Sequence, residues 1–495
     1  MSNAIEQRGF FWWVGDPSRP CHSLQTSVPG LLTVTAEGRT SLEVDGALAS
    51  DDEHADWAKP CPFDPGLSIV GLLDTPGDYV RLEGVERLDF RIADDSPQRQ
   101  SFSAATCIKR NHTFPADYGS DSYSELRIDL KGLEEWLELD SLRVDRDYGA
   151  ATGEREFVSY TNDKFGFSID DGTVSIESFT SGGSLFGLFG NHPQREIRFK
   201  QSFAIVYRPT LPSSLAHLQY VFAKIEQLLS LFLGSYFRLQ RPHFVRKEEP
   251  YEQWDTIFTH GDPPSTEELN RFFFLVPFTA VRDRFGPLLQ TWIYKSEVFG
   301  AGFYLYTASL RNQQTYAEDR LFALAAGIEA LHRKGFDSDS SQSSQDDRKR
   351  AERLLVLIPA DHPDKKWLER KLAHAHEPSL EQRLLECLRE LPLRFRKSEL
   401  EKFAKQCAAR RNDISHRGGP SAGTDYETFH AEITRLAEAL SYLFHLLILH
   451  KIGLPEEAVL NAATKSWVAE RIIKESFEAA DLHVVNEPAA QASQS

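Results

Sequence analysis

Cysteine is scarce in this sequence of 495 residues, and it is scattered. The five cysteines are Cys21, Cys61, Cys107, Cys387 and Cys407. No two of them form a CxxC pair, and no group of Cys and His has the close spacing of a zinc site. The pattern excludes a disulfide framework. It favours free thiols in a reducing cytoplasm, with no metal and no cofactor.

Long uncharged apolar segments are also missing. The most apolar stretch, Leu215 to Phe237, contains Lys224, Glu226 and Gln227. It therefore predicts a core helix and no membrane span. The N-terminus has no basic stretch followed by an apolar run and a small-residue cleavage site, so no secretion signal is expected.

Acidic residues outnumber basic ones, and the formal net charge is -17. A protein that coats nucleic acid by bulk electrostatics would need the opposite sign. The segment from Leu391 to Pro420 differs from the rest, with eight Lys or Arg against three Asp or Glu, a net of +5. A local basic site on an acidic body could still bind RNA selectively.

The length predicts two or three domains, and the fold class is α+β multidomain. Residues 1–210 have short alternating apolar runs between turn-like Gly, Pro, Asn and Asp clusters. Such runs are Leu42–Val44, Leu126–Leu130 and Ile197–Phe199, and such turns are Pro76–Asp78 and Asp170–Gly172. They predict a β-rich N-terminal domain, sandwich-like or a barrel, whose aromatic residues belong to the core.

Residues 211–310 are expected to be a helical and mixed connecting region. Apolar residues recur at steps of three and four from Leu215 to Phe232, which indicates a helix. The Pro- and charge-rich stretch from Arg241 to Thr266 is expected to be an exposed connection. The aromatic stretch from Phe272 to Leu310 has no clear periodicity.

Residues 311–480 predict an all-α bundle of five or six helices. Capping boxes are expected at Thr315–Glu318, Ser379–Gln382 and Ser398–Glu401. Asp337–Asp347, DSDSSQSSQDD, is expected to be a disordered loop. Helices are also expected at Arg348–Leu357, Asp364–His374 and Glu456–Phe477, and a long seam helix carries Ile433, Leu436, Leu440, Leu443 and Leu447. Residues 481–495 are expected to be a disordered tail.

The segment Arg411–His416 carries the residue types that cleave RNA without a metal. The nucleophile is the 2'-hydroxyl of RNA itself. An imidazole titrates near neutral pH, so His416 suits a general base or acid. A guanidinium keeps its charge and matches phosphate oxygens, so Arg411 suits the stabilisation of the pentacoordinate phosphate. Asn412 could orient the phosphate or hold the loop.

Helical spacing places Arg411 four residues after Cys407, on the extension of an apolar face. A charge on that side needs a partner or an anion, and Glu329 is one candidate partner. His416 lies about 140° further round an ideal helix. The two side chains of one chain therefore converge easily only if the helix ends or bends between them.

The spacing of Arg and His is not specific. Arg238…His243 and Arg370…His376 show similar spacing. Neither pair has the flanking polar residue, the following Gly418–Pro420 stop or a seam helix after it.

Longer segments add a resemblance to a known family. The order of an opening helix, a loop, further helices, Arg-Asn-x-x-x-His at 411–416 and a long helix resembles the HEPN superfamily. Phe322–Leu331, FALAAGIEAL, is similar to the opening helix of the ApeA-like HEPN group. Gly9–Trp12 and Pro29–Val34 are similar to the N-terminal domain that accompanies it.

This resemblance implies a bacterial antiphage ribonuclease that acts by abortive infection. It implies that the enzyme works without a metal and that its substrate is tRNA. It implies a homodimer through the HEPN domain and an N-terminal domain that senses a phage-derived trigger or restrains the nuclease. Arg411 and His416 are then the catalytic pair, supported by Asn412, Glu329 and Arg410. Two facing protomers could supply both an acid and a base, which one histidine cannot easily do.

Other functions stay open at this stage. The chain could be a non-catalytic RNA- or protein-binding sensor with a degenerate helical domain. The β-rich part could bind a carbohydrate or a phage protein and signal through the helices. Hydrolysis by Cys407 with His416 is disfavoured, because Cys407 lies on the core-facing stripe and no oxyanion site is apparent.

Overall fold

The structure is a computed structural model of the chain. It describes residues 3–485 apart from 15–26, 47, 49–67, 76, 94–95, 112–121, 140–141, 148–154, 162, 183–198, 249–250, 262, 266–268, 296–298, 312–315, 336–341, 360, 373–376, 421–422 and 424. The chain forms two compact units. The first is Met1–Glu226 with Phe237–Leu269, and the second is Gln227–Tyr236 with Asn270–Ser495.

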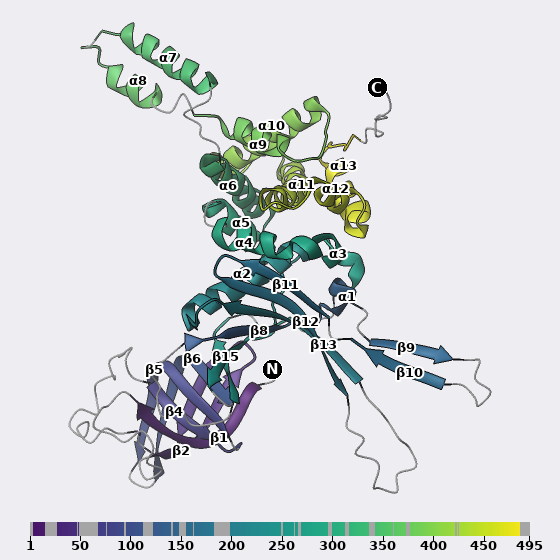
Figure 1. The fold of residues 1–495 in the computed structure, drawn as a ribbon. Coiled ribbons are helices and arrows are strands. Elements are labelled where there is room, and N and C mark those ends of the chain that lie inside the picture. Colours follow the sequence, from purple (N-terminus) through teal and green to yellow (C-terminus); the bar gives the residue numbers. More distant parts are fainter. Residues whose placement is uncertain are drawn as a thin grey trace. The chain divides into compact units, whose positions relative to one another are not determined.

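The first unit is β-rich, as its alternating apolar runs predict (Figure 1). Its strands are β1 Asn3–Val14, β2 Val28–Thr35, β3 Thr40–Val44, β4 Ser68–Leu73, β5 Asp78–Ala93, β6 Ser96–Asn111, β7 Ser122–Tyr123, β8 Glu125–Asp129, β9 Leu142–Asp147, β10 Arg155–Tyr160, β11 Lys164–Ile169, β12 Gly172–Gly182, β13 Phe199–Pro209, β14 Ser213–Ser214, β15 His243–Glu248 and β16 Tyr251–Thr259. A short helix, α1, spans Glu134–Leu137.

Six of these strands close into a barrel, in the order β6-β3-β2-β1-β4-β5, because β5 pairs back onto β6. Closure leaves no free edge in this ring. The remaining long strands continue the same antiparallel sheet from β6 through β16. The β-rich class is confirmed, and the ring of strands makes it a barrel where a sandwich-like arrangement was also considered.

The barrel interior is filled by alternate side chains, since successive residues of a strand point to opposite faces. Leu42 and Val44 of β3 are buried while Ser41 and Glu43 between them are exposed. The core cluster is Ile5, Phe11, Leu32, Val34, Leu42, Val44, Leu48, Ile69, Leu73, Val80, Leu82, Phe102, Cys107 and Phe258.

The expectation of an exposed connection from Arg241 to Thr266 is wrong. This stretch contains β15 and β16, which pair with each other and insert between β8 and β6. A cluster of charged and polar residues from distant parts of the sequence holds β15 and β16 in this position. Asp255 is fully buried and accepts two hydrogen bonds from Arg110, at 2.7 and 2.8 Å. Tyr123 Oη donates to the same carboxylate at 2.9 Å, and Arg246 donates at 3.2 Å.

The second unit is helical, which confirms the all-α class expected for it. Its helices are α3 Phe278–Val281, α4 Phe285–Lys295, α5 Ala301–Arg311, α6 Ala317–Gly335, α7 Gln342–Val356, α8 Lys365–Leu372, α9 Leu380–Arg389, α10 Lys397–Arg417, α11 Tyr426–Lys451, α12 Glu456–Thr464 and α13 Lys474–Ala479. Helix α2, Leu215–Leu233, carries the boundary between the two units within its length. The apolar stretch at Leu215 is thus a helix, and no helix among the described residues combines the length and apolar content of a membrane span.

Close backbone approach fixes the crossing of α5 and α6. A Cβ added to Gly302 would lie 2.3 Å from the carbonyl oxygen of Gly327, and one added to Gly327 would lie 2.7 Å from Phe444. Glycine lets the two helices meet without a side chain between them. Helix α6 is thereby held between α5 and α11 (Figure 1).

Two of the expected helix starts can be compared with the structure. At α9 the capping box is confirmed, because Ser379 accepts from the Gln382 amide and Gln382 accepts from the Ser379 amide. At α10 it is wrong, since the helix starts at Lys397 with Arg396 as its cap residue and no side-chain cap. Glu401, the residue that would complete the box, instead pairs with Arg389 at 3.2 Å. Thr315 lies outside the described residues.

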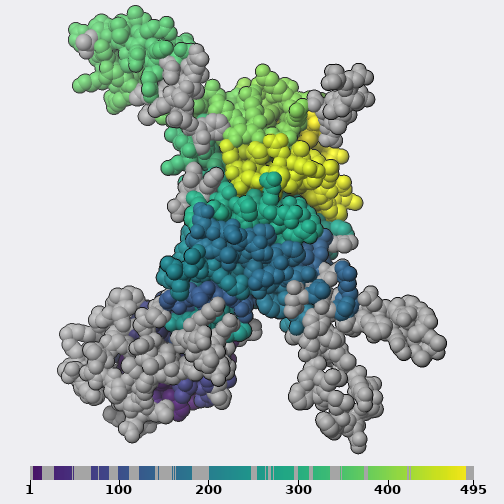
Figure 2. All heavy atoms as spheres, in the orientation of Figure 1, coloured from purple at the N-terminus to yellow at the C-terminus, as the bar shows by residue number. Residues whose placement is uncertain are grey.

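The expected loop at Asp337–Asp347 is helical from Gln342 onward, where α7 begins, and residues 337–341 lie outside the described part. The described atoms of α7 and α8 lie at the molecular surface (Figure 2). The single helix expected over Glu456–Phe477 is divided. After α12 the chain passes Lys465 and Ser466, whose amides both donate to Asn461 O, and forms a π-helical turn at Ala469–Ile473 before α13.

The tail begins later than residue 481. Leu482 is fully buried, and Val484 forms a bridge with Phe395. Residues 486–495 lie outside the described part.

The bundle interior contains one buried histidine with two polar partners. His445 of α11 donates from Nε2 to Leu231 O at 2.8 Å, and its Nδ1 accepts from the Tyr306 hydroxyl of α5. The carbonyl oxygen can only accept, so Nε2 carries a proton. Burial lowers the pKa of His445 to about 4, with the bond to Leu231 opposing part of that shift.

Candidate functional site

Helix α10 positions the Arg-Asn-x-x-x-His segment at the end of an apolar stripe. Its buried residues ahead of the segment are Leu400, Phe403, Ala404, Cys407 and Ala408. Gly418 ends the helix with a positive φ of 67°, and its amide donates to Ile414 O at 3.1 Å. The expected glycine stop is confirmed, and the last turn ends two residues beyond His416.

Arg411 continues the buried stripe and faces α6, as the spacing from Cys407 predicts. Its guanidinium carbon lies 5.2 Å from the centre of the Phe322 ring. Its Nη2 lies 3.8 Å from Glu329 Oε2, so the expected ion pair is present. Nη1 donates to Asn412 Oδ1 at 3.3 Å. The side chain is 23% exposed, which leaves it reachable from solvent.

The hydrogen-bonding capacity of Arg411 is only partly used. Its Nε is buried and has no hydrogen-bond partner among the residues that the structure describes. Glu329 is shared, because Arg333 approaches it more closely, at 3.1 Å. A guanidinium with unused donors and a long ion pair can still accept an anionic ligand.

Arg410 is bound in a different way. Its Nε and Nη2 contact Glu432 of α11 at 3.0 and 2.9 Å, and its Nη1 contacts Asp413 at 2.7 Å. Asp413 is buried and also receives Arg417 at 2.8 Å. Glu432 thus joins Arg410 to α11, and Asp413 holds Arg410 and Arg417 within α10, so Arg410 contributes to holding the helix in place.

Sequence reasoning missed Asp413 and Phe322 as parts of this site. The Asp413 contacts were available from helical spacing, because Arg410 and Arg417 lie three residues before and four residues after it. Phe322 was quoted only for its family resemblance. Its position under Arg411 depends on how α6 and α10 pack.

His416 lies on the solvent side of α10. It is exposed and makes no hydrogen bond or ion pair with any residue in the described ranges. Lys405, Ala409, Asn412 and His416 follow each other at steps of four, three and four, and all four are exposed. They form one stripe along the helix, which we call the α10 outer stripe.

Arg411 and His416 of one chain therefore do not converge. The helix is unbroken between them, so the five-residue step turns His416 about 140° away from Arg411. One side chain lies against α6 and the other faces solvent. The condition that the helix should end or bend between them is not met.

The positive charge counted around this segment is largely balanced by neighbouring elements. Arg411 meets Glu329, Arg410 meets Glu432, and Lys402 meets Asp481 at 2.9 Å. Glu329 and Glu432 lie outside the segment for which the sequence gives a net of +5. The local excess of positive charge is therefore smaller in the folded unit than in the sequence.

The two alternative Arg–His spacings do not form comparable sites in the described residues. Arg238 is bound to the buried carboxylate of Glu226, and His243 is hydrogen-bonded to Thr256 Oγ1 at 3.1 Å within β15 and β16. Burial lowers the pKa of His243, with Arg127 contributing to the shift. His376 lies outside the described residues.

The three cysteines that the structure describes do not provide a nucleophile near this segment. Cys407 is fully buried, and burial raises its pKa far above the ordinary value, which keeps it protonated. Cys107 and Cys387 are free and buried as well, with pKa values raised to about 12 by burial. Hydrolysis by Cys407 with His416 is disfavoured, because Cys407 is buried and its raised pKa keeps the thiol protonated.

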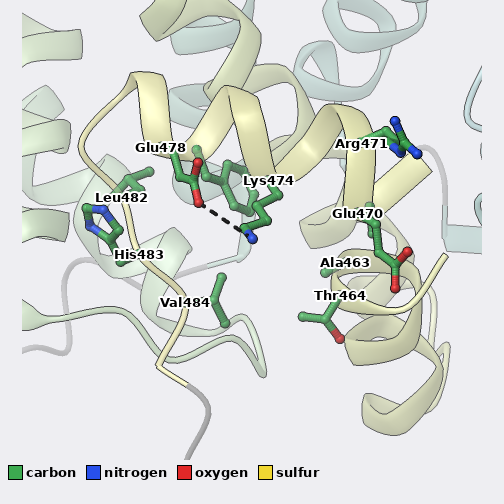
Figure 3. A pocket seen from close by; sticks show the side chains of 11 residues that line it. Ala463, Thr464, Glu470, Arg471, Lys474, Glu478, Leu482, His483 and Val484 are labelled. Carbon is green, nitrogen blue, oxygen red and sulfur yellow. Dashed lines mark ion pairs between the residues drawn. The ribbon is translucent and has the colours of Figure 1, made fainter. Parts of the chain in front are cut away.

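A cleft beside α12 and α13 is a second candidate (Figure 3). Its volume is about 550 Å³. It contains Arg471 and Lys474 as well as Glu470 and Glu478, with Lys474 Nζ 3.9 Å from Glu478 Oε1. In Figure 3 these charged groups do not converge on one point. Within the described residues, no three His, Cys, Asp or Glu side chains gather in a way that would hold a metal.

Comparison with protein families is informative, whereas no curated protein and no solved structure matches the chain. The family model ApeA N-terminal domain 1 matches residues 7–292, which is more than half of the chain. The Apea-like HEPN model matches residues 322–458, which include most of α6 and all of α10 and α11. The chain therefore belongs to the ApeA-like HEPN family of antiphage defence proteins, with an ApeA N-terminal domain ahead of an Apea-like HEPN domain.

Proposed function

We propose that this protein is a metal-independent endoribonuclease of antiphage defence, whose active site is completed by two copies of the chain. Arg411 and His416 are its catalytic residues. Asn412 and Glu329 position Arg411, and Arg410 anchors α10 to α11. The membership of the Apea-like HEPN family supports a ribonuclease, because HEPN domains are generally of that type.

The reaction is a transesterification within the RNA. One His416 takes the proton of the 2'-hydroxyl while the 2'-oxygen attacks the adjacent phosphorus. The bond from phosphorus to the 5'-oxygen breaks, and a second imidazole, in its protonated form, gives a proton to that oxygen. Arg411 stabilises the charge on the non-bridging oxygens of the pentacoordinate phosphate. The products are a 2',3'-cyclic phosphate and a free 5'-hydroxyl.

The observation that carries the proposal is the arrangement of Arg411 and His416 on one straight helix. Arg411 is held loosely enough to bind a phosphate, and His416 has an exposed imidazole without a partner in the described residues. They point apart within one chain. A second copy that packs on the α10 outer stripe would bring its own His416 opposite, so that two imidazoles face each other. Ala409, in the middle of the stripe, allows close approach.

The substrate class and the biological role follow from the same proposal. We infer RNA, with tRNA as the preferred class, cleaved in the cytoplasm during abortive infection. The N-terminal unit then responds to a phage-derived trigger or restrains the nuclease.

The test compares the purified full chain with His416→Ala and Arg411→Ala on a labelled tRNA in the presence of a chelator. Loss of general acid–base catalysis reduces a rate by about 10²- to 10⁴-fold. We expect both variants to lose cleavage to that extent, and the chelator to change nothing. His416 is exposed, so its replacement leaves the folded unit intact.

The matched control is His430→Ala, which removes another exposed imidazole, on α11. It should retain the activity of the wild type. Fragments that end in a 2',3'-cyclic phosphate identify attack by the 2'-hydroxyl. The proposal fails if His416→Ala cuts RNA at the wild-type rate, or if a chelator stops cleavage.

One observation favours a second candidate, a non-catalytic sensor that binds RNA or a protein. His416 has no carboxylate or carbonyl to orient its ring among the described residues, although catalytic bases are usually oriented by a third group. This candidate predicts that the chain binds RNA, that binding survives His416→Ala, and that the wild type cuts none of the RNAs offered.

A further inference from the structure

The hairpin of α7 and α8 is the part of the second unit with the least core. The two helices pack against each other (Figure 1). No residue of α8 is buried, and none of the side chains described on α7 is buried either. Large apolar side chains are exposed instead: Leu354 is 43% exposed, Val356 82%, Leu357 78% and Trp367 55%.

Cations without partners are concentrated on this hairpin. Residues 342–372 contain eight Lys or Arg against six Asp or Glu, a net of +2 in a chain of net charge -17. Five of these cations make neither an ion pair nor a side-chain hydrogen bond with any residue that the structure describes: Lys349, Arg350, Arg353, Lys366 and Lys371. This contrasts with Arg410, Arg411 and Arg417 of α10, each of which is paired.

The cations of α7 lie on one face. Lys349 and Arg350 precede Arg353 by four and three residues, which places all three on the same side of the helix. They line a hollow together with the carboxylates of Asp346 and Glu352, so its lining has three cations against two anions. Val356 and Leu357 continue the hollow at the last turn of α7. Trp367 of α8 is three residues from Arg370 and four from Lys371, so its indole also has cations beside it.

We propose that the α7–α8 hairpin holds the RNA substrate, with the α7 cations on its phosphates and the Trp367 indole stacked on an unpaired base. This inference rests on the proposed ribonuclease function. Phosphate binding requires cations that carboxylates do not neutralise, and the described cations of this kind are more numerous here than on α10. Single-stranded RNA is typically bound by a cationic surface with an aromatic platform.

RNA fits this surface better than a protein or a membrane does. A protein partner helix would require an apolar groove along the hairpin. The α7 face instead carries three cations and two carboxylates, and Val356 and Leu357 lie only at its end. A membrane-bound helix would require an apolar stripe along its length. The eight residues of α8 have one exposed large apolar side chain, Trp367.

The test measures RNA affinity in the full chain that carries His416→Ala, so that cleavage does not consume the probe. The hairpin variant adds Lys349→Glu, Arg350→Glu and Arg353→Glu. With a fluorescent tRNA, we expect its affinity to fall by on the order of tenfold or more. The slope of log Kd against log salt should become shallower by about two, because three phosphate contacts are lost. Adding Trp367→Ala alone should weaken binding by about fivefold or more and leave the slope unchanged.

The matched control adds Arg284→Glu, Lys334→Glu and Lys465→Glu, three exposed cations elsewhere in the second unit. It changes the net charge by the same amount and should leave the affinity within about threefold of the parent, because only unspecific attraction is reduced. Equal weakening in the control and the hairpin variant would overturn the proposal. An unchanged tRNA affinity in the hairpin variants would also overturn it. The same holds if the hairpin changes affect only the binding of anionic vesicles or of a protein.

The two proposals can fail separately. If the wild type cuts no RNA but the hairpin governs affinity, the ribonuclease proposal is lost and the hairpin proposal stands. If the wild type cuts tRNA and the hairpin variant, in a chain with His416 intact, cuts it with an unchanged KM, the hairpin proposal is lost and the ribonuclease stands.

Discussion

Arg411 of α10 shares the carboxylate of Glu329 with Arg333, and it has the longer contact, 3.8 Å against 3.1 Å. Glu329 and Arg333 lie one turn apart on α6, so their pair does not depend on α10. Glu329 therefore restricts the position of the Arg411 guanidinium, but it does not fully neutralise its charge. Under the proposed function, such a contact would orient Arg411 before it meets a phosphate.

Replacing Glu329 by Gln tests this positioning role. We expect cleavage to fall by about fivefold, because a partly exposed ion pair contributes about 1 kcal/mol or less. The effect should appear in kcat with little change in KM, since Arg411 acts on the transition state. Steady-state cleavage of a labelled RNA gives both constants.

Arg333→Gln is the control for that change. It removes the competing partner of Glu329 and leaves Arg411 in place. Its rate should equal or exceed that of the wild type. A rate for Glu329→Gln that matches the wild type would remove Glu329 from the site.

A mixed dimer tests whether the active site is shared. We expect a heterodimer of wild type and His416→Ala, purified with two different tags, to have less than about a tenth of the wild-type rate. One missing imidazole removes either the acid or the base from the common site. Independent sites would instead give half of the wild-type rate. Wild-type activity in a demonstrated monomer would also exclude a shared site.

The buried carboxylate of Asp255 gives a prediction for stability in the first unit. Asp255→Asn should lower the free energy of unfolding by about 3–5 kcal/mol, because Arg110 and Arg246 lose the negative charge that offsets their burial. The urea midpoint, followed by tryptophan fluorescence, measures the loss. Asp45→Asn is the control: Asp45 is 40% exposed and pairs with Arg8 and Arg99, and its change should cost about 1 kcal/mol or less. Equal shifts for the two variants would show that burial does not set the cost.

The buried His445 predicts that the helical unit becomes less stable in mild acid. Its pKa is about 4 in the folded chain, below its ordinary value of 6.5. Between these values the unfolded chain binds the proton more readily, so stability is full above about pH 6.5 and falls as the pH drops towards 4. At pH 5 this single group should cost about 2 kcal/mol.

His445→Gln measures that contribution. Glutamine can still donate and accept a hydrogen bond, but it does not titrate. The difference between the urea midpoints at pH 7 and pH 5 should therefore be smaller in the variant than in the wild type. An identical pH dependence in both proteins would assign the acid sensitivity to other groups.

Local patterns predicted those features that depend on residues within a few turns. The position of Arg411 follows from its four-residue step after Cys407, and the end of α10 follows from Gly418. The partner Glu329 could be chosen because α6 had a recognisable apolar face. The orientation of His416 also followed from the helical step, once the helix was known to be unbroken.

Features that depend on distant residues could not be predicted in the same way. Asp255 and Arg110 are separated by 145 positions, and the charged pattern around Asp255 alone is typical of a surface connection. The helix at Arg348–Leu357 was predicted, but the Ser- and Asp-rich composition of residues 342–347 hid the first turns of α7. The neutralisation of the α10 charge depends on Glu432 and Asp481, which reach it only through the packing of the bundle.

The nearly coreless hairpin of α7 and α8 also has a consequence for how such an enzyme can diversify. Side chains that support no interior can be exchanged without a penalty in folding, whereas Asp413 or Gly327 cannot. The hairpin could therefore be swapped between relatives as a cassette. Engineered chimaeras would then redirect the choice of RNA while the Arg411–His416 segment is kept unaltered.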